Sequence, residues 1–418
     1  MRINTEMKKI LFIAYLGFIL FSTQYTFAED VQPENSSFNI DYGLETRVGK
    51  TFSTHHNQLQ DGEFNNSKLR ISSEWTTPSG IILKEDIHAA SLSGFDRNSY
   101  DEIFVDELHA TYNTANNCSF RLGFQKVIWG QADRLRVVNV INPLDLRESY
   151  YNEWDKKYLS LGMLNSECSF ADQSIQILAI PQTRFYKLPI NTQLLQAVNT
   201  NKESTNDWNF GIKWSKKFER VDLGLYGYHG YEQYRHPVVL GFNNVNLEAN
   251  KYSMLGADFN STIGPFTLRG EFAEKTGVSP YPLNNLTSTI SIFNESIDHK
   301  INQESYLLGV DYPGATWNIS TQYLNVVNHG VLNQLKNQQI LTLAGQKYFL
   351  NNRVLLEAYS AIDLKKFGNN YLSLEGSYEI NNHWRLKAST EFFQQNEQNF
   401  LDAIKYQNRI FFSVMLNS

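Results

Sequence analysis

Apolar and polar residues alternate along this chain in segments of about ten residues, beginning near residue 38 and continuing almost to the end. Between residues 383 and 394, for example, Trp384 and Leu386 share one parity, whereas Arg385 and Lys387 share the other. Successive side chains of a β-strand point to opposite faces. Each segment therefore predicts a strand with one apolar face and one charged face.

Eighteen such segments can be delimited, and their connections alternate between short and long. The short connections include Pro78-Ser79, Pro313-Gly314 and Asn381-Asn382, which are residues that tight turns favour. The pattern predicts an all-β fold, a transmembrane antiparallel up-and-down β-barrel of 18 strands, with 16 as the alternative count. Short periplasmic turns would alternate with long outer loops. The predicted strands are 38–48, 67–77, 80–90, 103–113, 118–129, 158–168, 172–181, 208–217, 220–230, 251–261, 265–275, 304–312, 315–327, 340–350, 353–363, 370–380, 383–394 and 406–416.

The charged faces of these strands need water, because unpaired charges are prohibitive in a dry core. A soluble β-sandwich would also expose a polar face, but it does not explain the alternation of short and long connections. A barrel of about 16–18 strands encloses a water-filled lumen. The strand pattern therefore predicts a channel. Tryptophans near strand ends fit the aromatic girdles of membrane barrels, namely Trp75, Trp129, Trp208, Trp317 and Trp384.

The first 28 residues resemble a secretory signal. The basic run Met7-Lys8-Lys9 precedes an apolar stretch from Ile10 to Phe21, and Thr26-Phe27-Ala28 follows as the cleavage site. That stretch is shorter than the roughly 20 residues that a membrane-spanning helix needs. We expect residues 1–28 to be removed, leaving 29–418 as a single barrel domain in the bacterial outer membrane. A retained anchor is the alternative.

Composition and motifs argue against several other functions. The formal net charge is −6 and the charges are dispersed, so no nucleic-acid partner is expected. The sequence lacks a Gly-x-Ser-x-Gly elbow, a His-Glu-x-x-His motif and a phosphate loop. We expect no enzyme activity, no cofactor and no metal. His88 and His109 are expected on the lumen wall, and a catalytic role for them is the weaker interpretation.

Residues 129–157 break the strand pattern. They are too irregular for a strand pair and too apolar for a solvated loop, so we expect them to fold into the lumen and constrict it. Asn142 and Pro143 suggest the N-cap and first position of a helix. Charged residues of this segment would pair with wall residues such as Arg121 and Gln125; the alternative is that they only anchor the loop. The candidate lumen and constriction residues are Arg121, Gln125, Asp133, Arg134, Arg136, Asp145, Arg147 and Glu148.

Residues 121–145 also carry a resemblance. The run Arg121 to Asp133 contains Trp-Gly-Gln-Ala-Asp, and Asn142-Pro143-Leu144-Asp145 follows it. This block resembles the signature of a porin-like family of Gram-negative outer-membrane proteins of unknown function. The resemblance implies transport of hydrophobic or other small molecules, sometimes beside a periplasmic carrier or inner-membrane exporter. The signature positions are Trp129, Gly130, Ala132, Asp133, Asn142, Pro143 and Asp145.

Two cysteines flank the irregular segment. Cys118 begins the predicted strand before it and Cys168 ends the strand after it. If these strands are antiparallel neighbours, both cysteines lie at the periplasmic rim. An exported protein allows a disulfide. Free thiols and, less favoured, a metal site stay open as alternatives.

The sequence therefore favours an outer-membrane channel or facilitator for small molecules, embedded in outer-membrane lipid. The alternative is a binding or adhesion barrel with a closed lumen, which would act through the long loops 182–207 and 276–303. Those loops are rich in Asn, Thr and Ser. The identity of the solute and the direction of transport are open at this stage.

Overall fold

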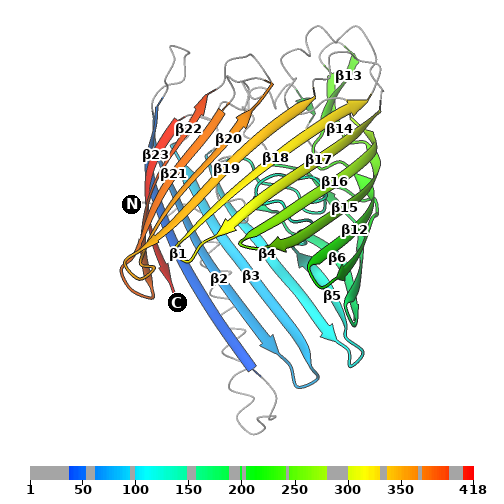
Figure 1. The fold of residues 1–418 in the computed structure, drawn as a ribbon, viewed down its shortest axis with the longest axis horizontal. Coiled ribbons are helices and arrows are strands. Elements are labelled where there is room, and N and C mark those ends of the chain that lie inside the picture. Colours follow the sequence, from blue (N-terminus) through cyan, green and yellow to red (C-terminus); the bar gives the residue numbers. More distant parts are fainter. Residues whose placement is uncertain are drawn as a thin grey trace.

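The structure is a computed structural model. It describes residues 37–52, 62–94, 99–147, 157–187, 198–199, 204–241, 244–279, 300–329, 337–365, 370–394 and 408–418. Most of these residues belong to one closed sheet (Figure 1). Within the described ranges, no helix is long and apolar enough to cross a membrane.

The sheet has eighteen strands, all paired antiparallel, and it closes because β1 pairs with β23. The predicted fold is confirmed. Every predicted strand has a counterpart, most within three residues at either end. The barrel strands are β1 (Ser37–Phe52), β2 (Gly62–Thr76), β3 (Ile81–Ser93), β4 (Tyr100–Asn113), β5 (Cys118–Gln125), β6 (Leu161–Phe170), β7 (Gln173–Ile180), β11 (Asn209–Lys217), β12 (Val221–Tyr231), β15 (Lys251–Ile263), β16 (Phe266–Val278), β17 (Ile301–Pro313), β18 (Trp317–His329), β19 (Gln338–Phe349), β20 (Val354–Asp363), β21 (Asn370–Glu379), β22 (Trp384–Gln394) and β23 (Asn408–Asn417).

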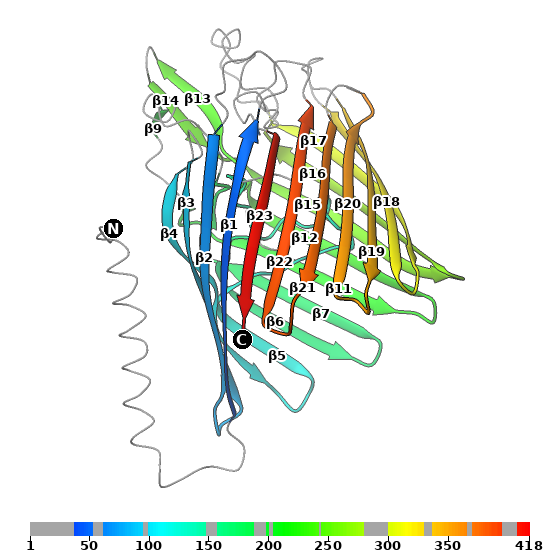
Figure 2. The ribbon, with the colours of Figure 1, turned by 90° about the vertical axis from the view of Figure 1, so that its left-hand side faces the viewer.

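Short strands that the sequence did not predict extend two of the long connections. β9 (Val198–Asn199), β13 (His236–Gly241) and β14 (Asn244–Glu248) form a small sheet, and β8 (Thr183–Arg184) pairs with β10 (Ser204–Thr205). Figure 2 shows β13 and β14 rising above the barrel at the end opposite the short turns. These strands are shorter than the barrel strands, and three of them have only two residues, so periodicity alone could not find them.

The two faces of the barrel differ as the alternation predicts. Large apolar side chains of one parity are exposed on the outside, such as Leu122 at 64%, Leu255 at 69% and Leu308 at 61%. Residues of the opposite parity include most of the charged groups and point inward. An apolar exterior of this extent requires lipid rather than water around it. The outer surface is therefore the membrane-facing side, and the inner surface carries the polar chemistry.

Candidate functional site: the inward segment and the lumen wall

The chain between β5 and β6 crosses the inside of the barrel. Its residues contact three strands that lie far from β5 around the barrel: Gln131 contacts Glu271 of β16, Asp133 contacts Gln322 of β18, and Arg134 lies over the ring of Tyr359 of β20. Figure 1 shows this segment behind the front strands β16 to β18. We call Lys126 to Arg147 the inward segment.

The segment starts earlier than the sequence predicted, because β5 ends at Gln125 and not at residue 129. Trp129 consequently lies inside the barrel rather than in a girdle, and it is 2% exposed. Its Nε1 donates to Gln176 Oε1 at 2.8 Å, and its ring fills the space beside Gly211. Trp129 thus anchors the start of the inward segment against β7 and β11.

Gly130 and its neighbours bind one carboxylate. Gly130 has φ of +86°, which favours glycine. The backbone N–H groups of Gln131 and Ala132 both donate to Glu271 Oε1, the second at 2.6 Å, and Val138 N donates to Oε2 at 3.3 Å. Glu271 is 5% exposed. Three backbone donors therefore satisfy a buried carboxylate and fix the segment to β16.

Asp133 and Arg134 lie at the far end of the segment, which we call its tip, and their charges hold it in place. Asp133 accepts from Arg269 Nη1 at 2.8 Å and from Gln322 Nε2 at 3.2 Å. Arg269 also pairs with Asp311 of β17. The guanidinium carbon of Arg134 lies 4.1 Å from the centre of the Tyr359 ring, a cation–π distance. The candidate residues Asp133 and Arg134 therefore contact β16, β18 and β20.

An apolar core lies between the segment and one side of the wall. Val137, Val138 and Ile141 are at most 1% exposed. They belong to a cluster with inward-facing residues of the barrel, which include Met163, Leu178, Tyr226, Tyr228, Tyr252, Met254, Ala273, Leu307 and Leu324. These residues come from β6, β7, β12 and β15 to β18. The apolar residues that looked wrong for a solvated loop are thus buried inside the lumen.

The predicted helix at Asn142 is wrong. Residues 142–147 are not helical, and Leu144 and Asp145 form isolated bridges to Tyr158 and Lys187. The Asn142 side chain instead links the start of the segment to the chain that leads into β6. Its Oδ1 accepts from Val127 N at 2.7 Å, and its Nδ2 donates to Leu159 O at 2.8 Å and to Gln125 O at 3.2 Å. Pro143 contributes its carbonyl, which accepts from Leu159 N at 2.8 Å.

Arg136 fixes the middle of the segment. Its guanidinium donates to the carbonyls of Asn139 and Asn142, at 2.7 and 2.9 Å, and to the hydroxyl of Tyr186 at 2.6 Å. Gln233, which follows β12, accepts from Arg136 and donates to the carbonyls of the segment. The role of Arg136 in this structure is to cross-link the segment with the loops that carry Tyr186 and Gln233.

The end of the segment forms an ion-pair cluster against β4. Arg147 pairs with Glu102 at 2.8 Å and with Asp145 at 2.6 Å, and Lys187 also pairs with Glu102. Burial alone would lower the pKa of Arg147, but Asp145 and Glu102 outweigh it and raise that pKa above its usual value. Arg147 is therefore a permanent cation here. Glu148 lies outside the described residues.

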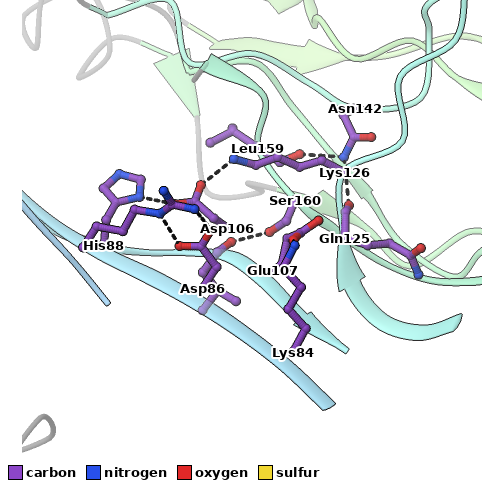
Figure 3. Close-up of polar contacts among 12 residues, drawn as sticks. Lys84, Asp86, His88, Asp106, Glu107, Gln125, Lys126, Asn142, Leu159 and Ser160 are labelled. Atoms are coloured by element: carbon purple, nitrogen blue, oxygen red, sulfur yellow. Dashed lines mark hydrogen bonds and ion pairs between the residues drawn. The ribbon is translucent and has the colours of Figure 1, made fainter. Parts of the chain in front are cut away.

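A second group of charged side chains lies along β2 to β5, beside Lys126 at the start of the inward segment (Figure 3). A β-bulge shifts the register between Asp86 and Ile87, which places both Asp106 and Glu107 of β4 on the inner face. Asp106 pairs with His88 and with Lys126, the latter at 2.5 Å. Glu107 pairs with Lys84, and Asp86 with the Arg70 guanidinium. This part of the inner wall therefore consists of acidic and basic side chains that pair with one another.

The expected pairing of the segment with Arg121 and Gln125 is wrong. Gln125 is fully buried, donates to Met163 O at 3.1 Å and accepts from Asn165 at 3.0 Å. Arg121 faces a small polar pocket of about 190 Å³ that Lys126, Asn165 and Glu167 also line. Both side chains face β6 and the start of the segment. The tip lies on the other side of the barrel, so its charges cannot reach them.

A larger cavity with a mixed polar and apolar lining lies between the tip and the opposite wall. It has a volume of about 780 Å³ and extends from Ala132, Asp133 and Arg134 to Pro313 at the end of β17. We call it the tip cavity. Its polar lining consists of Thr267, Arg269, Asp311, Asn318, Ser320, Gln322, Thr342, Gln346, Glu357, Ser373, Glu375 and Lys387, from strands β16 to β22.

At the rim, the corner after β12 carries a buried acid. The carboxylate of Glu232 accepts from Ser279 N at 2.9 Å and from Ser279 Oγ at 2.5 Å, and Glu232 is 4% exposed. Burial raises the pKa of Glu232 to about 6, although the bonds from Ser279 oppose the shift. This corner therefore titrates in a mildly acidic range.

Cys118 and Cys168 are bonded. They are register partners in β5 and β6, with sulfurs 2.12 Å apart. Cys118 shares the parity of Phe120 and Leu122, which are exposed on the outer face. The bond closes the base of the hairpin that carries the inward segment, next to the short turns at Asn117 and Ala171.

Sequence reasoning missed the residues that hold the segment from other strands. Arg269 and Glu271 could be recognised as inward charges from their parity, but not as partners of residues 131–138. Gln233 and Tyr186 lie in connections without periodicity. Their roles depend on which parts of the chain meet across the lumen, and no local pattern encodes this.

No protein-family model matches the sequence, and neither does any curated protein. Among solved structures, OccAB4 of Acinetobacter baumannii is 9% identical, with 93% of this chain and 100% of that chain covered and a TM-score of 0.55. OccAB3 of the same organism is 11% identical, with 91% and 99% covered and a TM-score of 0.52. Identities this low show the fold alone. The chain therefore has the porin-like β-barrel fold of bacterial outer-membrane proteins.

Proposed function

We propose that this barrel is a narrow channel for small polar solutes through the bacterial outer membrane, with the inward segment as its constriction. The tip cavity is the observation that carries the proposal. It is an interior space of about 780 Å³ whose walls carry charged and hydrogen-bonding side chains beside apolar residues such as Ile128 and Ala358. Polar walls of this kind favour water and polar solutes in the space that they enclose.

Two features support a narrow path. The apolar core of the inward segment fills the side of the lumen along β6, β7, β12 and β15 to β18. Across the barrel, the inward-facing pair Arg409 and Glu391 is 3% and 0% exposed, and the adjacent Phe411 is 0% exposed. Eighteen strands alone would leave a wide pore. We therefore expect a conductance well below that of an unobstructed barrel of this size.

The balance of charge supports weak ion preference. Acids and bases alternate on the inner wall and contact one another, as in the pairs Arg70–Asp86, Lys84–Glu107 and Lys387–Glu375. A wall of such pairs has no strong field of one sign. Partnership with a periplasmic carrier or inner-membrane exporter stays a prediction from the sequence resemblance.

Single-channel recording of the refolded protein in a planar bilayer tests the proposal. Small, steady ohmic steps are expected. Deletion of residues 131–150 should raise the step size, since it removes the tip and the core of the segment. Arg134→Ala, which only shortens one side chain of the tip, should raise the step size less. It provides a second test if the deletion variant does not fold. Heat-modifiable migration on a gel shows that each variant is folded.

The absence of current from folded, heat-modifiable protein would refute the channel and favour a closed, surface-binding barrel. That alternative would act through loops 182–207 and 276–303, most of which lie outside the described residues. Deletion of either loop would then abolish binding of its target.

A further inference from the structure

We infer that the tip cavity binds neutral, polyhydroxylated solutes such as sugars, an inference that rests on the proposed channel function. It concerns what the cavity recognises rather than whether the barrel conducts. The lining holds two kinds of polar group: charged groups, most of which pair with an opposite charge, and neutral groups, which lie together along two strands.

Most charged groups of the cavity pair with an opposite charge. Arg269 pairs with both Asp311 and Asp133. Lys387 pairs with Glu375 at 2.6 Å. The other two charges of the lining are one acid and one base: Glu357 accepts from the neutral Gln346 at 2.6 Å, and Arg134 lies over the Tyr359 ring. An incoming ion would have to displace an existing partner from any of these groups. The cavity therefore gives little advantage to anions or cations.

Neutral hydrogen-bonding side chains form a strip along two strands. Asn318, Ser320 and Gln322 are successive inward-facing residues of β18, and Thr342 and Gln346 face inward on the neighbouring β19. Amides and hydroxyls both donate and accept hydrogen bonds. Sugar hydroxyls also do both. Gln322 and Thr342 are buried, whereas Asn318, Ser320 and Gln346 are only partly buried. Each of these three makes a hydrogen bond within the protein, but an amide or a hydroxyl has further donor or acceptor positions. They can therefore bind hydroxyls of one solute without a change of charge.

The size of the cavity agrees with this class of solute. A volume of about 780 Å³ lies within the range of small-molecule sites, about 300–1,000 Å³. Asn318 and Ser320 are half-buried, so each retains surface toward the cavity. The strip also lies beside the tip, because Ser320 and Gln322 donate to Asp133. A bound sugar would consequently lie beside the constriction and obstruct the ion current.

The test is titration of the ion current with maltose, in a planar bilayer that contains the refolded full-length barrel. Tetraethylene glycol is the matched probe, because its ether oxygens only accept hydrogen bonds and only its terminal hydroxyls can donate, whereas every hydroxyl of maltose does both. Maltose should reduce the current saturably and beyond its effect on bulk conductivity, whereas tetraethylene glycol should follow bulk conductivity. The double variant Asn318→Leu/Ser320→Ala should weaken the apparent affinity for maltose about tenfold, as expected from the loss of two hydrogen bonds.

Asn260→Leu is the control variant, because it makes the same amide-to-leucine change on the inner face of β15, outside the lining of the cavity. It should leave the maltose effect unchanged. Absence of any ion current would refute the channel itself. Normal current with equal effects of maltose and tetraethylene glycol would refute only the sugar site. A saturable maltose effect that survives the double variant would refute its assignment to the tip cavity.

Discussion

The carboxylate of Glu271 occupies the space that a side chain on Gly130 would need. A Cβ atom built on Gly130 would lie 2.4 Å from Glu271 Oε1 and 2.7 Å from Val138 Cγ2. The glycine thus lets a β16 acid approach the backbone of the inward segment and accept its N–H groups. This contact gives the Trp-Gly pair a physical reason within this molecule.

We expect Gly130→Ala to destabilise the barrel by about 2 kcal/mol, because it adds both a clash and an unfavourable positive φ. The measurement is the free energy of unfolding in urea after refolding into lipid vesicles. Gly345→Ala is the control, since a Cβ there would meet nothing within 4 Å. Equal stability of the two variants would contradict this account of Gly130.

Glu271→Gln should loosen the inward segment while the barrel stays closed. The amide loses the negative charge and turns an NH₂ group toward backbone donors, which should cost about 2 kcal/mol. Hydrogen exchange followed by mass spectrometry should show the amides of residues 131–138 exchanging about thirtyfold faster, the rate equivalent of that energy. Glu274→Gln, on the outward face of the same strand, should leave them unchanged. Unaltered exchange in Glu271→Gln would show that other contacts hold the segment.

Removal of the disulfide should lower stability without altering the channel. The bond joins residues 50 apart in sequence, and in the chain-entropy model a loop of this length contributes about 4 kcal/mol. The double variant Cys118→Ser/Cys168→Ser should lose unfolding free energy of that order. Its single-channel conductance should equal that of the parent, because the bond lies on the outer face. A changed conductance would mean that the bond positions the inward segment.

Glu232 should make stability depend on pH in one direction. Its folded pKa of about 6 exceeds its usual value of 4.5, so the folded state binds the proton more tightly than the unfolded state. Protonated Glu232 therefore adds to the free energy of unfolding below pH 4.5. This stabilisation, about 2 kcal/mol, is lost as the pH rises through about 6. Unfolding free energies of the parent and Glu232→Gln at pH 4 and pH 7.5 measure it. The variant should lack this part of the pH dependence; an identical dependence in both would exclude Glu232 as the cause.

The barrel could be predicted from the sequence because its information is local. The alternation of residues such as Trp384 and Arg385 indicates which face of a strand is apolar. A tight turn such as Pro313-Gly314 indicates where a strand ends. Repetition along the chain then fixes the number of strands. The bulge at Asp106 was not predicted, since two adjacent acids on one face contradict the simple alternation.

The inward segment shows where local information ends. Asn142 followed by proline has the form of a helix start, but the same amide makes three long-range hydrogen bonds that outweigh this tendency. Placement of the segment in the lumen followed from its apolar residues. Its partners Arg269 and Glu271 could not be predicted, because nothing near residue 131 specifies which distant strand faces it.

The bond between Cys118 and Cys168 has a topological consequence. Together with the chain between them, it makes a covalent ring that contains β5, the inward segment and β6. A single proteolytic cut anywhere inside this ring would leave the polypeptide in one piece on a non-reducing gel. Two fragments would separate only after reduction. Cuts in any other connection would release fragments at once, so the ring marks the one stretch of the barrel where a nick leaves the chain covalently whole.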